Sequence, residues 1–106
     1  MGALKEVSDN NFKESTSKGL VMVDFWAPWC GPCRMVTPVL EGLQAELGDK
    51  VSIVKMNVDD NPEIATQFGI TSIPTLMIFK DGELVDRTMG AAPKEHYKTL
   101  LGKHIA

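Results

Sequence analysis

Cysteine, basic charge and long apolar runs are all scarce in this sequence. Its 106 residues hold two cysteines, too few for a scaffold held by several disulfides. The net charge of −3 argues against a basic nucleic-acid-binding face, because phosphate contacts need clustered lysine and arginine. No apolar run approaches the roughly 20 residues that cross a bilayer. We therefore expect neither a nucleic acid nor a membrane among its partners.

The N-terminus shows no targeting pattern. It has no long apolar segment of the kind found in secretory signals, and Glu6 stands where a myristoylation pattern needs Ser or Thr. The 43% hydrophobic and 24% charged residues match an average globular domain, and the length suits one domain over residues 1–106. With so few cysteines, these features favour a reducing cytoplasm.

Helical and strand patterns alternate along the chain. Period-3.6 patterns and capping residues predict helices over 8–18, 32–47, 60–69 and from 93 onward. Apolar runs predict strands over 20–27, 51–58, 75–79 and 84–89. Ser8 or Asp9 would cap the first helix, Pro38 would kink the second, and Asp81-Gly82 would turn a hairpin. The simplest assembly is an α/β fold in which a mixed sheet has helices on both faces.

The two cysteines lie close together in the chain. Cys30 and Cys33 flank Gly31-Pro32, so a disulfide between them would close a very short loop and stabilise little. A thiolate is the species that attacks disulfides, and Cys30 stands just before the helix that Pro32 opens, where the helix dipole favours an anion. We expect Cys30 to be the exposed, more acidic thiol that attacks, and the shielded Cys33 to displace the product.

Three other readings of the pair remain open: half of a zinc site, a soft-metal chaperone loop, and inert cysteines. Structural zinc needs four ligands, and the only histidines, His96 and His104, fall in the last predicted helix. A CxxC pair beside a strand–helix–strand pattern favours redox chemistry. We expect no metal and no other cofactor.

Residues 23–33 read Val-Asp-Phe-Trp-Ala-Pro-Trp-Cys-Gly-Pro-Cys. Together with Ile73-Pro74-Thr75 and the turn at Gly82, this stretch resembles the thioredoxin family, and the resemblance runs over nearly the whole chain. It implies the thioredoxin fold, a five-stranded mixed sheet of order 1-3-2-4-5 flanked by four helices. It also implies a monomeric thiol–disulfide oxidoreductase, a general protein-disulfide reductase recharged by a thioredoxin reductase.

The resemblance also assigns roles to residues. Cys30 matches the nucleophile and Cys33 the resolving thiol. It implies a cis Ile73–Pro74 bond and an apolar docking surface for substrates, formed by Trp29, Gly31, Pro32, Ile73, Pro74, Gly90 and Ala91. From the residues alone, Ile73 and Gly90 would be ordinary core and turn positions. Met89 departs from the family, which more often has a β-branched residue there, and this predicts a softer docking edge.

Asp24 and Lys55 are charged residues inside otherwise apolar predicted strands. We expect the Asp24 carboxyl to be buried with a raised pKa and to accept a proton from Cys33. The alternative is a carboxyl that only hydrogen-bonds nearby backbone. Lys55 is either a solvated lysine or, as the family implies, a partner for Asp24.

Two further functions remain as alternatives. One is a donor dedicated to a single partner enzyme. The other is a binding module that uses the same fold as a subunit or scaffold and needs neither cysteine. Turnover of a disulfide substrate with a reductant separates the module from an enzyme.

Overall fold

The computed structural model describes residues 4–105 and builds one mixed sheet in the order β1-β3-β2-β4-β5. β1, β3 and β2 are parallel, whereas β4 runs antiparallel to both of its neighbours, β2 and β5. This confirms the sheet and the strand order that the sequence resemblance implies. The strands are β1 (Lys5–Glu6), β2 (Leu20–Trp26), β3 (Ser52–Asn57), β4 (Thr75–Lys80) and β5 (Glu83–Met89).

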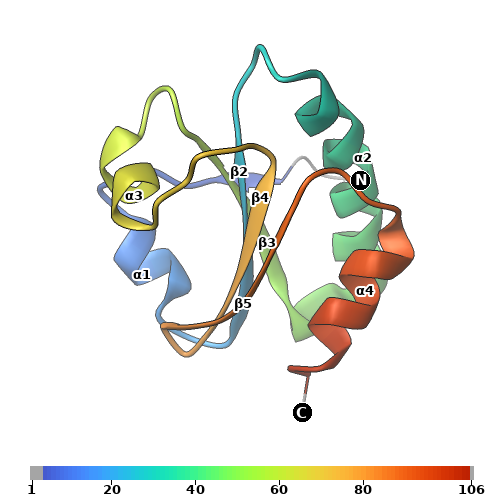
Figure 1. Cartoon of the computed structure of the whole chain (residues 1–106). Coiled ribbons are helices and arrows are strands. Elements are labelled where there is room, and N and C mark those ends of the chain that lie inside the picture. The colour runs from blue at the N-terminus through green and yellow to red at the C-terminus, as the bar shows by residue number, and fades with distance from the viewer. Residues whose placement is uncertain (1–3, 106) are drawn as a thin grey trace.

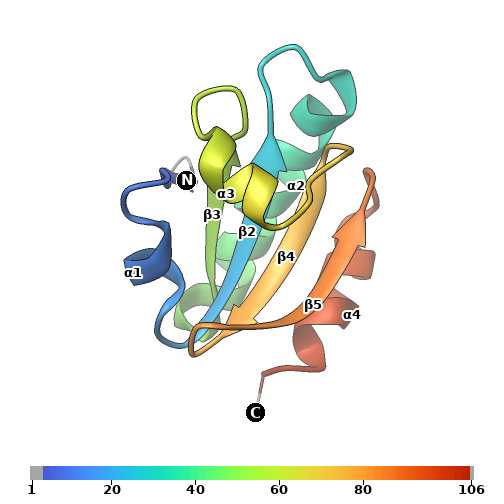
Figure 2. The ribbon, with the colours of Figure 1, turned by 60° about the vertical axis from the view of Figure 1, so that its left-hand side comes forward.

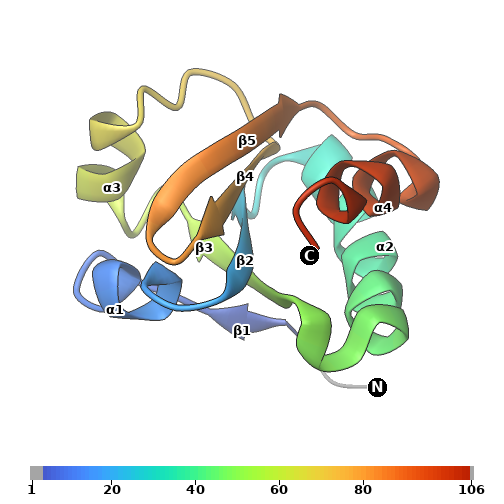
Figure 3. The same ribbon diagram turned by 90° about the horizontal axis from the view of Figure 1, so that it is seen from below.

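The helices lie in two layers, one on each face of the sheet (Figure 1). α1 (Phe12–Thr16) and α3 (Pro62–Gln67) cover one face, and α2 (Gly31–Leu47) and α4 (Lys94–Gly102) cover the other. The view from below shows the sheet between these layers (Figure 3). A short 3₁₀ turn, η1 (Gly48–Lys50), follows α2. The four predicted helices are all present.

β2 shows how the two faces are filled. Alternate side chains of a strand point to opposite faces. Val21, Val23 and Phe25 join the core cluster beneath α1 and α3, whereas Met22 joins the cluster beneath α2 and α4. By the same alternation, Asp24 belongs to the face that α2 and α4 cover.

The hairpin between β4 and β5 confirms the turn prediction. Asp81 and Gly82 have φ values of 50° and 89°, the pair of positive values that a type I′ turn needs. The register then shifts, because Ile78 pairs with Asp86 while Phe79 pairs with Leu84. β5 therefore carries a bulge. Pro93 directly precedes α4, as the sequence predicts.

Two local predictions were wrong. The first helix covers Phe12–Thr16 instead of 8–18. The Asp9 carboxylate does not cap it but accepts from the backbone N–H groups of Glu63 (3.2 Å) and Ile64 (2.9 Å) at the start of α3. This long-range contact takes the residue that the local pattern assigned as a cap. The pattern also gave no sign of β1, which is only two residues long.

Candidate active site

The cysteine pair lies in the loop where β2 gives way to α2. Cys30 and Cys33 form a disulfide with a Cα–Cα distance of 5.3 Å. Cys30 is the N-cap of α2, and its Sγ accepts the backbone N–H of Cys33 at 3.2 Å. Pro32 occupies the first helical turn, where a missing N–H costs nothing. A thiolate on Cys30 would keep that N–H donor and the positive end of the helix dipole.

The disulfide is more enclosed than the sequence led us to expect. Cys30 is 4% exposed and Cys33 is 1% exposed. The prediction of an exposed Cys30 is wrong for this disulfide form, because the sulfur lies between the α2 N-terminus and the Ile73 carbonyl oxygen, which is 3.9 Å from Cys30 Sγ. Gly31 and Pro32 are exposed and form the rim above the bond.

Trp29 stands out from this rim. Its side chain is 67% exposed, and its Nε1 donates to the Asp59 carboxylate at 3.0 Å. A groove of about 430 Å³ runs between Trp29 and the segment before β4, and Val58, Ile70 and Ile73 line it. The groove approaches the disulfide through Ile73, whose carbonyl oxygen lies 3.9 Å from Cys30 Sγ.

The Ile73–Pro74 peptide bond is cis, as the resemblance implies. Ile73 is half-buried and Pro74 is buried. The Pro74 carbonyl accepts the Gly90 N–H at 2.8 Å, which joins the start of β4 to the segment after β5. Gly90 has a φ of 85°, and it and Ala91 are exposed. The predicted docking residues thus come from three distant segments that meet at one end of the sheet (Figure 2).

Asp24 is buried in β2, with an exposed fraction of 0%. Neither carboxylate oxygen has a hydrogen-bond partner among residues 4–105, so the alternative of a backbone-bonded carboxyl does not hold. Burial raises the pKa of Asp24 to about 7, and the nearby Lys55 ammonium lowers it only in part. The group is poised to gain or lose a proton near neutral pH.

Lys55 lies directly opposite Asp24 in the β2–β3 register. It is half-buried, and its Nζ lies 5.0 Å from the centroid of the Trp26 ring, close enough for a cation–π contact. Lys55 therefore acts on Asp24 through its charge and not through a direct hydrogen bond.

Sequence reasoning missed two residues that support the site. Asp59 was not among the predicted site residues, yet its carboxylate accepts a hydrogen bond from Trp29 Nε1. Tyr97 was not among them either, yet its buried hydroxyl donates to the Gly90 carbonyl at 3.2 Å. A lone tyrosine on an apolar helix face is a signal for the second, because a buried hydroxyl needs a partner. No local pattern links Asp59 to Trp29.

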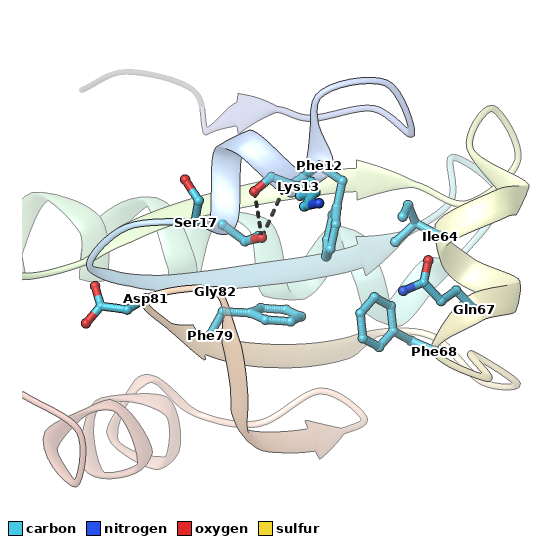
Figure 4. A pocket seen from close by; sticks show the side chains of 10 residues that line it. Phe12, Lys13, Ser17, Ile64, Gln67, Phe68, Phe79, Asp81 and Gly82 are labelled. Carbon is cyan, nitrogen blue, oxygen red and sulfur yellow. Dashed lines mark hydrogen bonds between the residues drawn. The ribbon is translucent and has the colours of Figure 1, made fainter.

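A second hollow, of about 440 Å³, lies between α1 and α3 on the other face of the sheet (Figure 4). Phe12, Phe68 and Phe79 meet there with ring centroids 5.5–5.6 Å apart. None of the predicted site residues lines it. Within residues 4–105, no group of three or more His, Cys, Asp or Glu side chains is placed to hold a metal, and no helix is long and apolar enough to cross a membrane.

A mixed sheet of this order, with a redox-active cysteine pair at the start of α2, defines a thiol–disulfide oxidoreductase. The chain belongs to the thioredoxin family, whose family model, Thioredoxin, matches residues 3–103. It is 52% identical to the thioredoxin of Bacillus subtilis, over 97% of this chain and 99% of that protein. It is 54% identical to the thioredoxin of Listeria monocytogenes, over 96% and 99%. Thioredoxin 1 of Synechococcus elongatus is 50% identical, over 99% and 100%.

Members of this family act on disulfides and are generally reduced by a thioredoxin reductase. The chain is a protein-disulfide oxidoreductase whose redox centre is the Cys30–Cys33 pair.

Proposed function

We propose that the chain acts as one monomeric domain in the cytoplasm, where it reduces disulfides in a range of proteins and is recharged by a thioredoxin reductase. The observation that carries this proposal is the pair itself. Cys30 Sγ accepts a helix N-terminal N–H, and Cys33 is within bonding distance but shielded. A groove beside Trp29 supplies a place for substrates of varied sequence.

The first step is attack by the Cys30 thiolate on one sulfur of the substrate disulfide. The substrate S–S bond breaks, a mixed disulfide forms, and the other substrate sulfur leaves and takes up a proton. The N–H of Cys33 and the α2 dipole stabilise the thiolate before attack. Trp29, Gly31, Pro32, Ile73, Gly90 and Ala91 hold the substrate, while the buried Pro74 shapes the surface from below.

The second step releases the product. Cys33 gives its proton to the Asp24 carboxylate, directly or through a water, and attacks Cys30 Sγ. The mixed disulfide breaks as the Cys30–Cys33 disulfide forms, and the second substrate sulfur leaves as a thiolate that takes up a proton from the solvent. In total the substrate gains two electrons and two protons. The raised pKa of Asp24, about 7, suits a proton acceptor that works near neutral pH, and the charge of Lys55 keeps part of the population ionised.

Trapping experiments test the two cysteine roles. Cys33→Ser should accumulate a mixed disulfide with a substrate protein such as insulin, visible on a non-reducing gel and mapped to Cys30 by mass spectrometry. Cys30→Ser should trap nothing and should not turn over. Preferential alkylation of reduced Cys33 at neutral pH would reverse the assignment. Turnover on a single substrate only would indicate a dedicated donor, and no turnover by the parent protein would indicate a binding module.

A further inference from the structure

The methionines of residues 4–105 divide sharply by exposure. The side chains of Met22, Met56 and Met77 are 0% exposed, whereas Met35 is 70% and Met89 is 61% exposed. Among residues 4–105, the two exposed methionines lie in segments next to the proposed docking surface. Met35 follows Cys33 by two residues in α2 and shares a groove with Ala91 and Ala92, and Met89 directly precedes Gly90. The exposed thioethers described by the structure thus border the proposed docking surface.

Met89 has a specific neighbour. Its Sδ accepts the Ser72 hydroxyl at 3.6 Å, and Ser72 directly precedes the Ile73–Pro74 pair. Met89 also pairs with Thr75 at the end of the β4–β5 ladder. β5 ends there, at the same end of the sheet as the β2–α2 loop (Figure 2). A change at the Met89 sulfur would therefore act on both segments that frame the docking surface.

We propose that Met89 is a site of oxidative modification, at which a peroxide converts the thioether to a sulfoxide and thereby weakens the docking of protein substrates. The docking consequence rests on the proposed function. In the reaction the peroxide O–O bond breaks, an S–O bond forms and water leaves. The sulfur loses two electrons, and the peroxide gains them.

The disulfide form favours this reaction at Met89. Cys30 and Cys33 are bonded to each other and almost completely enclosed, so they offer a peroxide no thiolate. The Ser72 hydroxyl, already directed at Sδ, can donate to the sulfoxide oxygen, which is a stronger acceptor than a thioether sulfur. The product is a polar group held at the edge of an apolar surface, where a substrate side chain would have to strip it of water.

The first part of the test maps the modification. The disulfide form is treated with hydrogen peroxide, and its peptides are examined by mass spectrometry. Oxygen should be added at Met89 and Met35, while Met22, Met56 and Met77 should remain unmodified. Ser72→Ala, which lacks the hydroxyl that contacts Met89 Sδ, is treated in the same way as a matched control. Oxidation that leaves Met89 unmodified, or that reaches the buried methionines first, overturns the proposal.

The second part measures docking. Peroxide is removed, the disulfide is reduced with dithiothreitol, and rates are measured with insulin and with the small disulfide 5,5′-dithiobis(2-nitrobenzoate). The KM for insulin should rise about fivefold, the size expected when part of a buried apolar contact is lost. The rate with the small disulfide should not change, because that substrate makes little contact beyond the reacting sulfurs.

Two variants assign the effect. Treated Met89→Leu should keep its own untreated KM, whereas treated Met35→Leu should still show the rise. An equal rise in Met89→Leu, or modification of Met89 without any rise, contradicts the inference. If the untreated protein reduces neither substrate, the proposed function is wrong and the docking consequence is wrong with it. The peptide map would still decide whether Met89 is modified.

Discussion

At the scale of single residues, the burial of Asp24 lowers the stability of the folded protein when the carboxyl is charged. Asp24 lies in an apolar strand with both carboxylate oxygens unpartnered, and its pKa rises from 3.8 to about 7. A rise of that size corresponds to roughly 4 kcal/mol. Because the folded protein holds the proton more tightly than the unfolded chain, the free energy of unfolding falls as pH rises from about 4 to about 7 and then levels off.

Asp24→Asn should therefore make the disulfide form more stable at neutral and higher pH, since the neutral amide carries no buried charge. The gain in the free energy of unfolding should be about 2–3 kcal/mol larger at pH 8 than at pH 5. Urea unfolding at the two pH values measures it. The variant should also slow product release by Cys33 and leave the attack by Cys30 nearly unchanged, as single-turnover kinetics would show.

The exposed Asp49 supplies a matched control. Asp49→Asn should leave the rate of product release unchanged, because Asp49 lies in η1 and outside the site. If Asp24→Asn gains nothing at pH 8 and releases product at the parent rate, Asp24 is only a structural polar residue.

The residues that were predictable carry their own local signal. Cys30 and Cys33 form a motif, and Asp24 stands out as a charge in an apolar run. The residues that were missed act across the chain. Asp59 supports Trp29 from 30 positions away, and nothing near either residue reveals the contact. Such contacts depend on how the helices, strands and loops pack together. The periodicity of the sequence does not contain that information.

At the scale of elements, α3 depends on a residue far from it in the chain. It has six residues, and its own N-cap, Asn61, makes no side-chain capping bond. Asp9 caps the helix instead, because its carboxylate accepts the N–H groups of Glu63 and Ile64. This explains why local rules found the start of α3 but placed the start of α1 too early. The capping residue Asp9 lies just before α1 in the chain, but it caps α3.

Asp9→Ala should lower the free energy of unfolding by about 1 kcal/mol, the usual effect of losing an N-cap. Chemical denaturation of the disulfide form measures the change. Asp9→Asn keeps one acceptor oxygen and should lose less. If Asp9→Ala loses no stability, the two hydrogen bonds contribute nothing measurable to α3.

At the scale of the whole molecule, the fold brings three segments that are distant in the chain to one end of the sheet. The β2–α2 loop, the start of β4 and the segment after β5 meet there, and the Gly90–Pro74 hydrogen bond joins the last two of them. The strand pattern predicted four of the five strands and the hairpin. The order of the strands came from family resemblance, because periodicity alone does not say which strands are neighbours.

Reducing the disulfide should lower the global free energy of unfolding by about 2 kcal/mol, because the bond closes a loop of only a few residues and restricts the unfolded chain little. Urea unfolding followed by circular dichroism, with and without dithiothreitol, measures the difference. The double variant Cys30→Ser/Cys33→Ser should have the same free energy of unfolding with and without dithiothreitol. A much larger loss on reduction would mean that the dithiol form rearranges its packing.

The outer strands of the sheet bear on a different property, resistance to aggregation. An unpaired strand edge invites pairing with another chain unless it is short, charged or irregular. β1 offers only two residues, Lys5 and Glu6, and both are charged and exposed. β5 is longer, but it is interrupted by its bulge and carries Glu83, Asp86 and Arg87. Neither edge strand offers an incoming chain a flat, apolar strand to pair with. A protein that binds segments of other polypeptides at one end of its sheet is therefore protected from aggregating with them through its edge strands.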